Sequence, residues 1–136
     1  TIEAIMTAKP FKVSQHVNIN KARLLMADHK IRHLPVVDID SGRIIGLLSQ
    51  RALLGNALKV INKRGFEQLE NCEKSTDVAS IMDTEPAVCQ LSDKLMDVAQ
   101  KLKSLRSGCV SIEADEQLVG VVTSSDFVKL YINQQA

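Results

Sequence analysis

The alternation of apolar and polar positions along residues 1–62 predicts a β-α-β-β-α order of elements. These are an extended run at 11–13, a helix with Ile19, Ala22, Leu25 and Met26 on one face, strands at 34–38 and 43–48, and a helix from about Gln50. A polar turn at 38–42 separates the two strands. This half of the chain therefore predicts a small sheet flanked by helices.

Residues 77–136 repeat the same order. The elements are an extended run at 87–89, a helix with Leu95, Val98, Ala99, Leu102 and Leu105 facing inward, strands at 109–113 and 117–122, and a helix from Ser124. The matched positions are Ile5, Met6, Pro10 and Gly46, which correspond to Ile81, Met82, Pro86 and Gly120. A duplication constrains the architecture before any single residue is interpreted. We expect an α/β (α+β) fold of two pseudo-symmetric β-α-β-β-α repeats, packed sheet to sheet with helices outside and sharing a cleft.

Residues 63–76 connect the two copies. They hold no Pro or Gly run that would make a free tether, and Leu58, Val60 and Ile61 indicate that the preceding helix continues to a loop near Gly65. We expect a surface connector with some packing. The predicted organisation is repeat 1 at 1–62, the connector at 63–76 and repeat 2 at 77–136, together forming one compact module.

Composition narrows the class of protein. A chain of 136 residues that is 45% hydrophobic and 24% charged suits one compact domain. Its net charge of +1, with both signs scattered, gives no basic surface for nucleic acid. No apolar run approaches the roughly 20 residues that cross a bilayer, and no signal-peptide pattern opens the chain. We expect a cytoplasmic protein without membrane insertion, and the opening Thr1 is compatible with a piece of a longer chain.

Chemistry-bearing residues do not form a recognisable catalytic or metal-binding set. Cys72, Cys89 and Cys109 are odd in number and contain no CxxC pair, which disfavours both a disulfide framework and a zinc site. His16 and His29 lack ligand spacing, so we assign them no role. No nucleophile with a base, and no phosphate-binding glycine loop, is evident. We therefore expect no enzyme activity, no metal and no catalytic cofactor.

Several motifs nevertheless carry a family resemblance. IMTxxP, KIRHLPVVD and a strand exit of glycine, two apolar residues and Ser or Thr recur in order, and they resemble a tandem cystathionine-β-synthase-type (CBS) domain pair, also called a Bateman module. The resemblance covers almost the whole chain. It implies a regulatory module that binds AMP, ADP, ATP, NAD or S-adenosylmethionine in the cleft between repeats. It also implies signalling by conformational or dimer rearrangement, with the helices after Ser49 and Thr123 as natural surfaces of a homodimer.

Two other interpretations stay open at this point. The chain could be a dimerisation or scaffold module whose cleft is filled by side chains. It could also be the regulatory fragment of a larger enzyme, transporter or transcription factor.

The segment Val121 to Asp126 is the most informative chemical string, because a buried strand ends there and a helix begins. A helix start offers unpaired N–H groups to phosphate, and one carboxylate can accept hydrogen bonds from both ribose hydroxyls. The resemblance places Thr123 near phosphate and Asp126 on the ribose. The same spacing is also that of a capping box, and the two roles can coexist.

The resemblance completes this main pocket with residues from both copies. They are Thr7, Lys9, Phe11, Ile31 and Arg32 from the first copy, and Ser107 and Val121 from the second. Phe11 and Ile31 could sandwich an adenine, the backbone around Thr7 could read its edge, and Ser107 could approach phosphate. Ordinary core packing is the alternative for the two apolar residues.

The first copy departs from the pattern, since Ala52 stands where the second copy has Asp126. The two pockets should therefore differ, with the weaker one built from Arg32, His33, Ser49 and Arg51. Two arginines and a histidine without a ribose acid suit a phosphate-rich or non-nucleoside anion. A solvated basic edge is the alternative interpretation.

Overall fold

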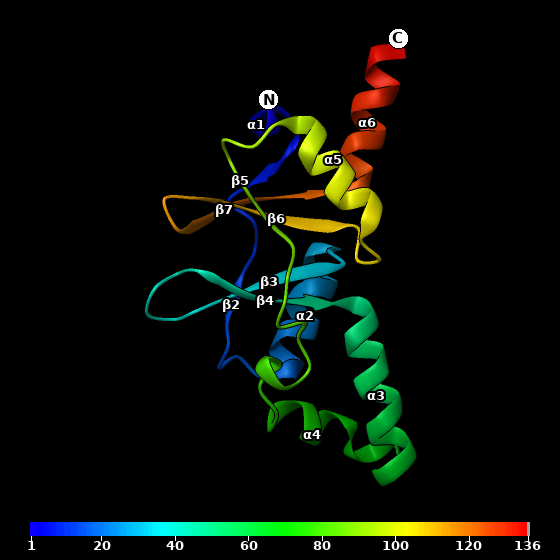
Figure 1. Ribbon diagram of the computed structural model, residues 1–136. Helices are drawn as coiled ribbons and strands as arrows, with labels where there is room; N and C mark the ends of the chain where they lie inside the picture. Colours follow the sequence, from blue (N-terminus) through cyan, green and yellow to red (C-terminus); the bar gives the residue numbers. More distant parts are fainter. Residues whose placement is uncertain (136) are drawn as a thin grey trace. The chain divides into compact units, whose positions relative to one another are not determined.

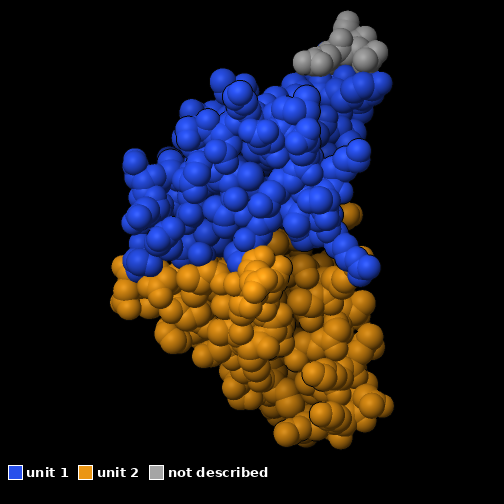
Figure 2. Space-filling view, in the orientation of Figure 1, with its two compact units in different colours: residues 1–10, 41–44, 86–136 blue, residues 11–40, 45–85 orange. Residues whose placement is uncertain are grey.

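The computed structural model describes residues 1–135 and separates into two compact units (Figures 1 and 2). Unit 1 holds residues 1–10, 41–44 and 86–136, and unit 2 holds residues 11–40 and 45–85. The mixed α/β class, with two small sheets and flanking helices, is confirmed. The units do not follow the sequence repeats, because each repeat's opening segment belongs to the unit built mainly from the other repeat.

Unit 2 contains a three-stranded sheet with the strand order β2-β3-β4. Its elements are β2 (Val13–Ser14), α2 (Ile19–His29), β3 (His33–Val37), β4 (Ile44–Ser49), α3 (Gln50–Arg64), α4 (Leu69–Lys74) and 3₁₀ turns at Phe66–Gln68 and Val78–Ser80. Strand β2 runs parallel to β3. The predicted face of α2 packs on this sheet, since Ile19, Ala22 and Met26 are buried with Leu34 and Leu48.

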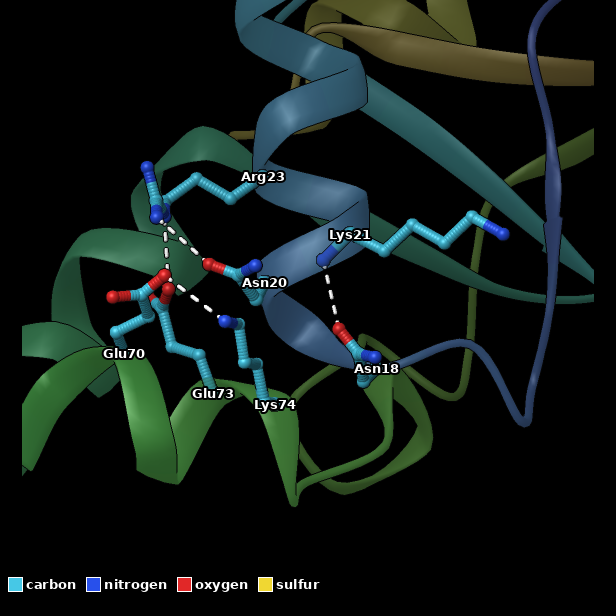
Figure 3. Close-up of polar contacts among 7 residues, drawn as sticks. All are labelled: Asn18, Asn20, Lys21, Arg23, Glu70, Glu73 and Lys74. Carbon is cyan, nitrogen blue, oxygen red and sulfur yellow. Dashed lines mark hydrogen bonds and ion pairs between the residues drawn. The ribbon is translucent and has the colours of Figure 1, made fainter.

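Local chemistry sets the ends of α2. The Asn18 side chain accepts a hydrogen bond from the Lys21 N–H at 2.8 Å, which caps the first turn (Figure 3). At the other end Lys30 adopts the left-handed conformation with φ 54°, and its N–H closes on the Ala27 and Met26 carbonyls. The chain is thereby turned sharply from α2 into β3.

The expected surface connector holds a helix that the sequence did not indicate. Helix α4 packs beside α2, and its Glu73 side chain is only 1% exposed. Arg23 of α2 donates from Nε to Glu73 Oε1 at 2.9 Å and from Nη2 to Asn20 Oδ1 at 3.0 Å (Figure 3). The connector was expected to lie at the surface with some packing, and here one of its acids is buried against an arginine from another helix.

Unit 1 contains a four-stranded sheet with the strand order β1-β7-β6-β5. Its elements are α1 (Ile2–Ile5), β1 (Thr7–Ala8), β5 (Val88–Gln90), α5 (Leu95–Ser104), β6 (Cys109–Ala114), β7 (Gln117–Thr123) and α6 (Ser124–Gln135). Strands β6 and β7 form an antiparallel hairpin, and both turn residues, Asp115 and Glu116, have positive φ as this tight turn requires. The core joins Val98 and Leu102 of α5 to apolar residues of β6 and β7.

Opening segments are exchanged between the repeats. In unit 1, β1 pairs antiparallel with β7, placing Thr7 opposite Val121. In unit 2, Leu47 and Asp83 exchange backbone hydrogen bonds of 3.0 and 2.9 Å. Neither pairing was predicted from the sequence.

The turn at residues 41–44 connects β3 to β4 but belongs to unit 1. The Gln117 side chain donates to the Ser41 carbonyl at 2.7 Å, and Arg43 lies 3.8 Å from the buried Glu113 carboxylate. These polar contacts hold the turn on the β6–β7 hairpin.

Candidate functional site

The start of α6 positions Thr123 and Asp126. Asp126 turns back so that its Oδ2 accepts from the Thr123 N–H at 2.8 Å and from the Thr123 hydroxyl at 3.2 Å. This is the acid's half of the capping box that the spacing allowed, while the Thr123 hydroxyl donates to the same carboxylate. Both bonds reach the same oxygen, which leaves Asp126 Oδ1 outside them. The half-buried carboxylate therefore keeps an acceptor atom while it fixes the first turn of the helix.

A tight loop brings Ser107 to the same end of the sheet. Gly108 has φ 64°, and its carbonyl accepts from the Ser124 N–H at 3.1 Å. A Cβ on Gly108 would lie 3.2 Å from the Ser124 hydroxyl oxygen, so glycine is favoured both by conformation and by space. Ser107, Gly108 and the first turn of α6 are therefore held together.

The buried thiol of Cys109 lies close enough to Asp126 for the carboxylate to affect its pKa. The thiol is 1% exposed, and its pKa is raised to about 12, first by burial and then by the negative charge of Asp126. Both effects disfavour a thiolate. Cys109 is therefore a structural thiol beneath the candidate site and not a nucleophile.

The pairing of β1 with β7 places two more predicted residues beside β7. Thr7 lies opposite Val121, and the Lys9 N–H donates to the Val119 carbonyl at 3.3 Å. Thr7 and Lys9 are both exposed. Unit 1 thus contains six of the nine predicted main-pocket residues, which are Thr7, Lys9, Ser107, Val121, Thr123 and Asp126.

The other three, Phe11, Ile31 and Arg32, belong to unit 2. Phe11 is 46% exposed and stacks on His29, with ring centroids 3.8 Å apart and an interplanar angle of 21°. Ile31 is half-buried and packs against the unit 2 core. Sequence reasoning gave His29 no role, and no spacing signal could have paired it with Phe11, because the contact depends on how the chain enters β2.

The weaker predicted pocket gathers at the start of α3. Ser49 caps this helix by accepting from the Ala52 N–H at 3.0 Å, and the Gln50 N–H donates to the Arg32 carbonyl at 2.9 Å. Arg51 is exposed in the first turn, and His33 opens β3. Ala52 packs against the core where the second copy has Asp126, so this turn has a cap but no acid.

The described residues lack two other kinds of feature. Among residues 1–135, no group of three or more His, Cys, Asp or Glu side chains is arranged to hold a metal ion. Within the same range, no helix has both the length and the apolar character needed to cross a membrane.

Comparison with solved structures gives the same architecture throughout. An acetoin utilization protein (AcuB) from Vibrio cholerae is 30% identical, with a TM-score of 0.78 over 98% of this chain and 91% of that one. CBSX2 from Arabidopsis thaliana is 25% identical, with a TM-score of 0.83 over 99% and 96%. CBSX2 has also been solved in complex with AMP. The CBS domain pair of protein MJ0100 is 21% identical, with a TM-score of 0.77 over 98% and 96%, and was solved with 5′-methylthioadenosine and S-adenosyl-L-methionine.

Curated relatives are longer proteins. The Meiotically up-regulated gene 70 protein of Schizosaccharomyces pombe is 24% identical, and the match covers 92% of this chain but 18% of that protein. The L-aspartate semialdehyde sulfurtransferase of Methanocaldococcus jannaschii is 25% identical over 96% of this chain and 23% of the enzyme. This chain thus spans about a fifth of their lengths. The CBS domain family itself matches twice, at residues 2–59 and 78–133, in the order that the duplication predicted. The chain belongs to the CBS domain family and contains a tandem pair of its repeats.

Proposed function

We propose that this CBS pair is a regulatory ligand-sensing module that binds an adenosine-containing ligand in the cleft between its repeats. The observation that most supports this proposal is at the start of α6. There Thr123 donates both of its hydrogen bonds to Oδ2 of Asp126, so Oδ1 is not used in them. A fixed carboxylate beside a helix start suits a ribose joined to phosphate. The AMP complex of CBSX2 and the S-adenosyl-L-methionine complex of MJ0100 support this ligand class.

Six of the nine predicted residues have a stated role in the proposed complex. Asp126 accepts hydrogen bonds from the ribose hydroxyls, and Thr123 and Ser107 face the phosphate. Phe11 and Ile31 hold the adenine, with the backbone of Thr7 at its edge. The remaining members of the pocket are Lys9, Arg32 and Val121. His29 occupies one face of Phe11 by stacking, so the base either uses the other face or displaces the imidazole.

The two pockets should not be equivalent. Ala52 has no acceptor for a ribose hydroxyl and packs on the core, while Arg32, His33, Ser49 and Arg51 present cationic and hydroxyl groups. The proposed main site is therefore the one that contains Asp126. A ligand at the start of α3 would be recognised through its negative charge.

The proposed module acts by shifting conformations and not by catalysis. A ligand moves such an equilibrium only if it binds one arrangement better than another. A homodimer is the proposed carrier of the signal. Val128, Tyr131 and Ile132 are 54%, 65% and 58% exposed along one side of α6, and such apolar stripes mark association surfaces. A cytoplasmic location stays a prediction.

The test is a binding titration of the purified chain by calorimetry with AMP, ADP, ATP, NAD and S-adenosylmethionine. One of them should bind saturably, and Asp126→Ala should abolish the binding. The matched control is Asp93→Ala. Asp93 Oδ2 accepts a hydrogen bond from the Gln90 N–H at 2.8 Å, and Asp93 lies outside the proposed site. Each alanine removes one hydrogen bond from a backbone N–H to a carboxylate and should cost about 1 kcal/mol of stability. Equal binding by wild type and Asp126→Ala would contradict the proposed site.

A ligand-free scaffold module is the second candidate function. The Asp126 carboxylate favours the scaffold function as well, because its hydrogen bonds with Thr123 already give this side chain a structural role. Under this function no nucleotide would stabilise the chain. A ligand present at about 100 times its dissociation constant should otherwise add about 2.7 kcal/mol, which a thermal-shift assay detects easily.

A further inference from the structure

Phe11 and His29 form a stacked pair of rings in unit 2, with centroids 3.8 Å apart and an interplanar angle of 21°. Both residues lie at the surface, since Phe11 is 46% exposed and His29 is exposed at the end of α2. The hydrophobic core of unit 2 contains neither of them. The pairing is therefore not a by-product of core packing, and it places a second ring on a side chain that the proposed complex needs for adenine.

The backbone is fixed on both sides of the stack. Phe11 lies between β1, which pairs with β7, and β2, which pairs with β3. His29 is the last residue of α2, and the left-handed cap at Lys30 closes on the Ala27 and Met26 carbonyls. Within residues 1–135, the His29 side chain makes no hydrogen bond or ion pair. The imidazole can therefore leave Phe11 by rotation about its own side-chain bonds, without a change in the fold.

The imidazole covers the ring face that adenine would use. In the proposed complex the base lies between Phe11 and Ile31. Ile31 follows His29 by two residues, and its N–H donates to the Met26 carbonyl at 3.0 Å, so both residues belong to the closed end of α2. A base between Phe11 and Ile31 would therefore approach Phe11 from the α2 side, as the imidazole does. Rings 3.8 Å apart are already in van der Waals contact, so no base fits between them.

We propose that His29 is an autoinhibitory residue of the adenine site and thereby sets the preference of that site for a base. In the free chain the imidazole stacks on Phe11, and a base binds only after the imidazole has rotated away. This role rests on the proposed function, since it concerns the same face of Phe11. It adds to that function a residue outside the predicted pocket, one that opposes binding instead of contributing to it.

The effect on affinity follows from the strength of the stack. An aromatic pair of typical strength keeps about two to ten closed chains for each open one. The apparent affinity for a base is reduced to the fraction of chains that are open, so removal of the imidazole should tighten binding about three- to tenfold. Stacking of a nucleic acid base on an aromatic side chain is generally at least as strong as such a ring pair, which lets adenine displace the imidazole.

The stack opposes the base and not the sugar or the phosphate. Ribose 5-phosphate carries the hydroxyl and phosphate groups that are proposed to meet Asp126 and Thr123, but it places nothing on Phe11. Its affinity should not depend on His29. The imidazole therefore narrows the difference in affinity between an adenine nucleotide and ribose 5-phosphate by about three- to tenfold.

Calorimetric titration of the full chain with AMP and with ribose 5-phosphate, at a single pH, tests this role. His29→Ala should bind AMP about three- to tenfold more tightly than wild type does and bind ribose 5-phosphate equally. His29→Phe supplies another ring to cover Phe11, so it should bind AMP no more tightly than wild type does. His16→Ala is the matched control and should change neither affinity. His16 is also an exposed histidine of unit 2, but its Nδ1 lies 4.0 Å from Asp77 Oδ2.

The outcomes separate this role from the proposed function. AMP affinities that are equal in wild type and His29→Ala, with binding lost in Asp126→Ala, would overturn the role of His29 and leave the adenosine function standing. Weaker binding of AMP by His29→Ala would also overturn it, because the imidazole would then stack on the base and hold it. Equal tightening of AMP and ribose 5-phosphate would assign the effect to something other than the ring face. Failure of AMP to bind either wild type or His29→Ala would overturn both the role and the adenine site.

Discussion

Met6 covers Gly120 so closely that a Cβ at this glycine would lie 2.5 Å from the Met6 sulfur. The pseudo-equivalent pair is Met82 over Gly46, where a Cβ would lie 2.9 Å from the Met82 Cγ. In each pair the methionine comes from one repeat and the glycine from the other. The sequence matched Met6 with Met82 and Gly46 with Gly120, and the structure shows that the contacts cross between the copies.

Gly120→Ala should therefore destabilise the fold by about 1 to 3 kcal/mol, the usual effect of overpacking. The added methyl group would meet the Met6 side chain and also the Thr7 carbonyl oxygen at 3.1 Å, which is backbone and cannot rotate away. Gly46→Ala should cost less, because the three nearest atoms all belong to the flexible Met82 side chain. Urea unfolding of both variants measures the difference. Equal losses would show that the backbone contact is unimportant.

Gly55→Ala should have the opposite sign. Gly55 lies inside α3, and a Cβ there would meet nothing within 4 Å. Alanine has a higher helix propensity than glycine, by about 1 kcal/mol in an exposed helix interior, so the free energy of unfolding should rise by up to that amount. The same urea titrations report it. A loss of stability would mean that α3 needs the glycine for a contact that the isolated chain does not make.

Arg23→Met should be strongly destabilising, because it leaves the Glu73 carboxylate buried without its cation. Fully buried pairs lose about 3 to 5 kcal/mol in this way, and the 43% exposure of Arg23 should place the loss nearer about 2 kcal/mol. Glu73 Oε2 is already buried without a partner, so the carboxylate has little else to compensate it.

The double variant Arg23→Met with Glu73→Leu should recover much of that loss, since no charge then stays buried. Lys74→Gln is the control. It breaks an exposed pair with Glu70 at 3.1 Å and should cost about 0.5 kcal/mol or less (Figure 3). Thermal unfolding of the three variants checks the order. A double variant less stable than Arg23→Met alone would contradict the argument.

Cys109 should make the fold less stable at alkaline pH. Its pKa is raised from 9.0 to about 12 by burial and then by Asp126, so the unfolded thiol ionises first as the pH rises. Unfolding then releases a proton, and the contribution present below about pH 9 is lost progressively up to about pH 12. The slope is at most about 1.36 kcal/mol per pH unit for one thiol.

Urea unfolding between about pH 8 and pH 11 measures this slope, and Cys109→Ala should flatten it while lowering stability below about pH 9. Asp126→Ala should flatten it only slightly, because burial is the larger cause of the raised pKa. An unchanged slope in Cys109→Ala would assign the alkaline loss to other groups.

Periodicity predicted the elements that bury a regular face. The helical spacing of Ile19, Ala22 and Met26 gave α2, and the β-branched run after His33 gave β3, because both signals come from neighbours in the sequence. The Thr123 to Asp126 spacing likewise predicted the bond by which the Asp126 carboxylate reaches back to the Thr123 N–H. Local patterns were sufficient wherever the deciding contact is itself local.

Long-range contacts escaped prediction. Strand β1 has two residues, both exposed, so no apolar alternation could reveal it. Glu73 lies in a polar run, a pattern typical of a solvated surface. Its burial is tolerated because Arg23 of α2 pairs with its carboxylate, a contact between residues far apart in the sequence. The stacking of Phe11 on His29 similarly joins two turns whose positions depend on the finished sheet. That the predicted pocket residues bind one ligand together stays a prediction.

The exchange of opening segments has a consequence for the order in which the chain can fold during its synthesis. Residues 11–85 contain all of unit 2, so that unit can form once residue 85 has left the ribosome and Asp83 has paired with Leu47. Residues 7–8 must wait for β7, the last strand of the chain, and closing so long a loop is entropically unfavourable and slow. A segment made before all of unit 2 is therefore placed only after β7 has been made, and until then Met6 has no glycine to cover.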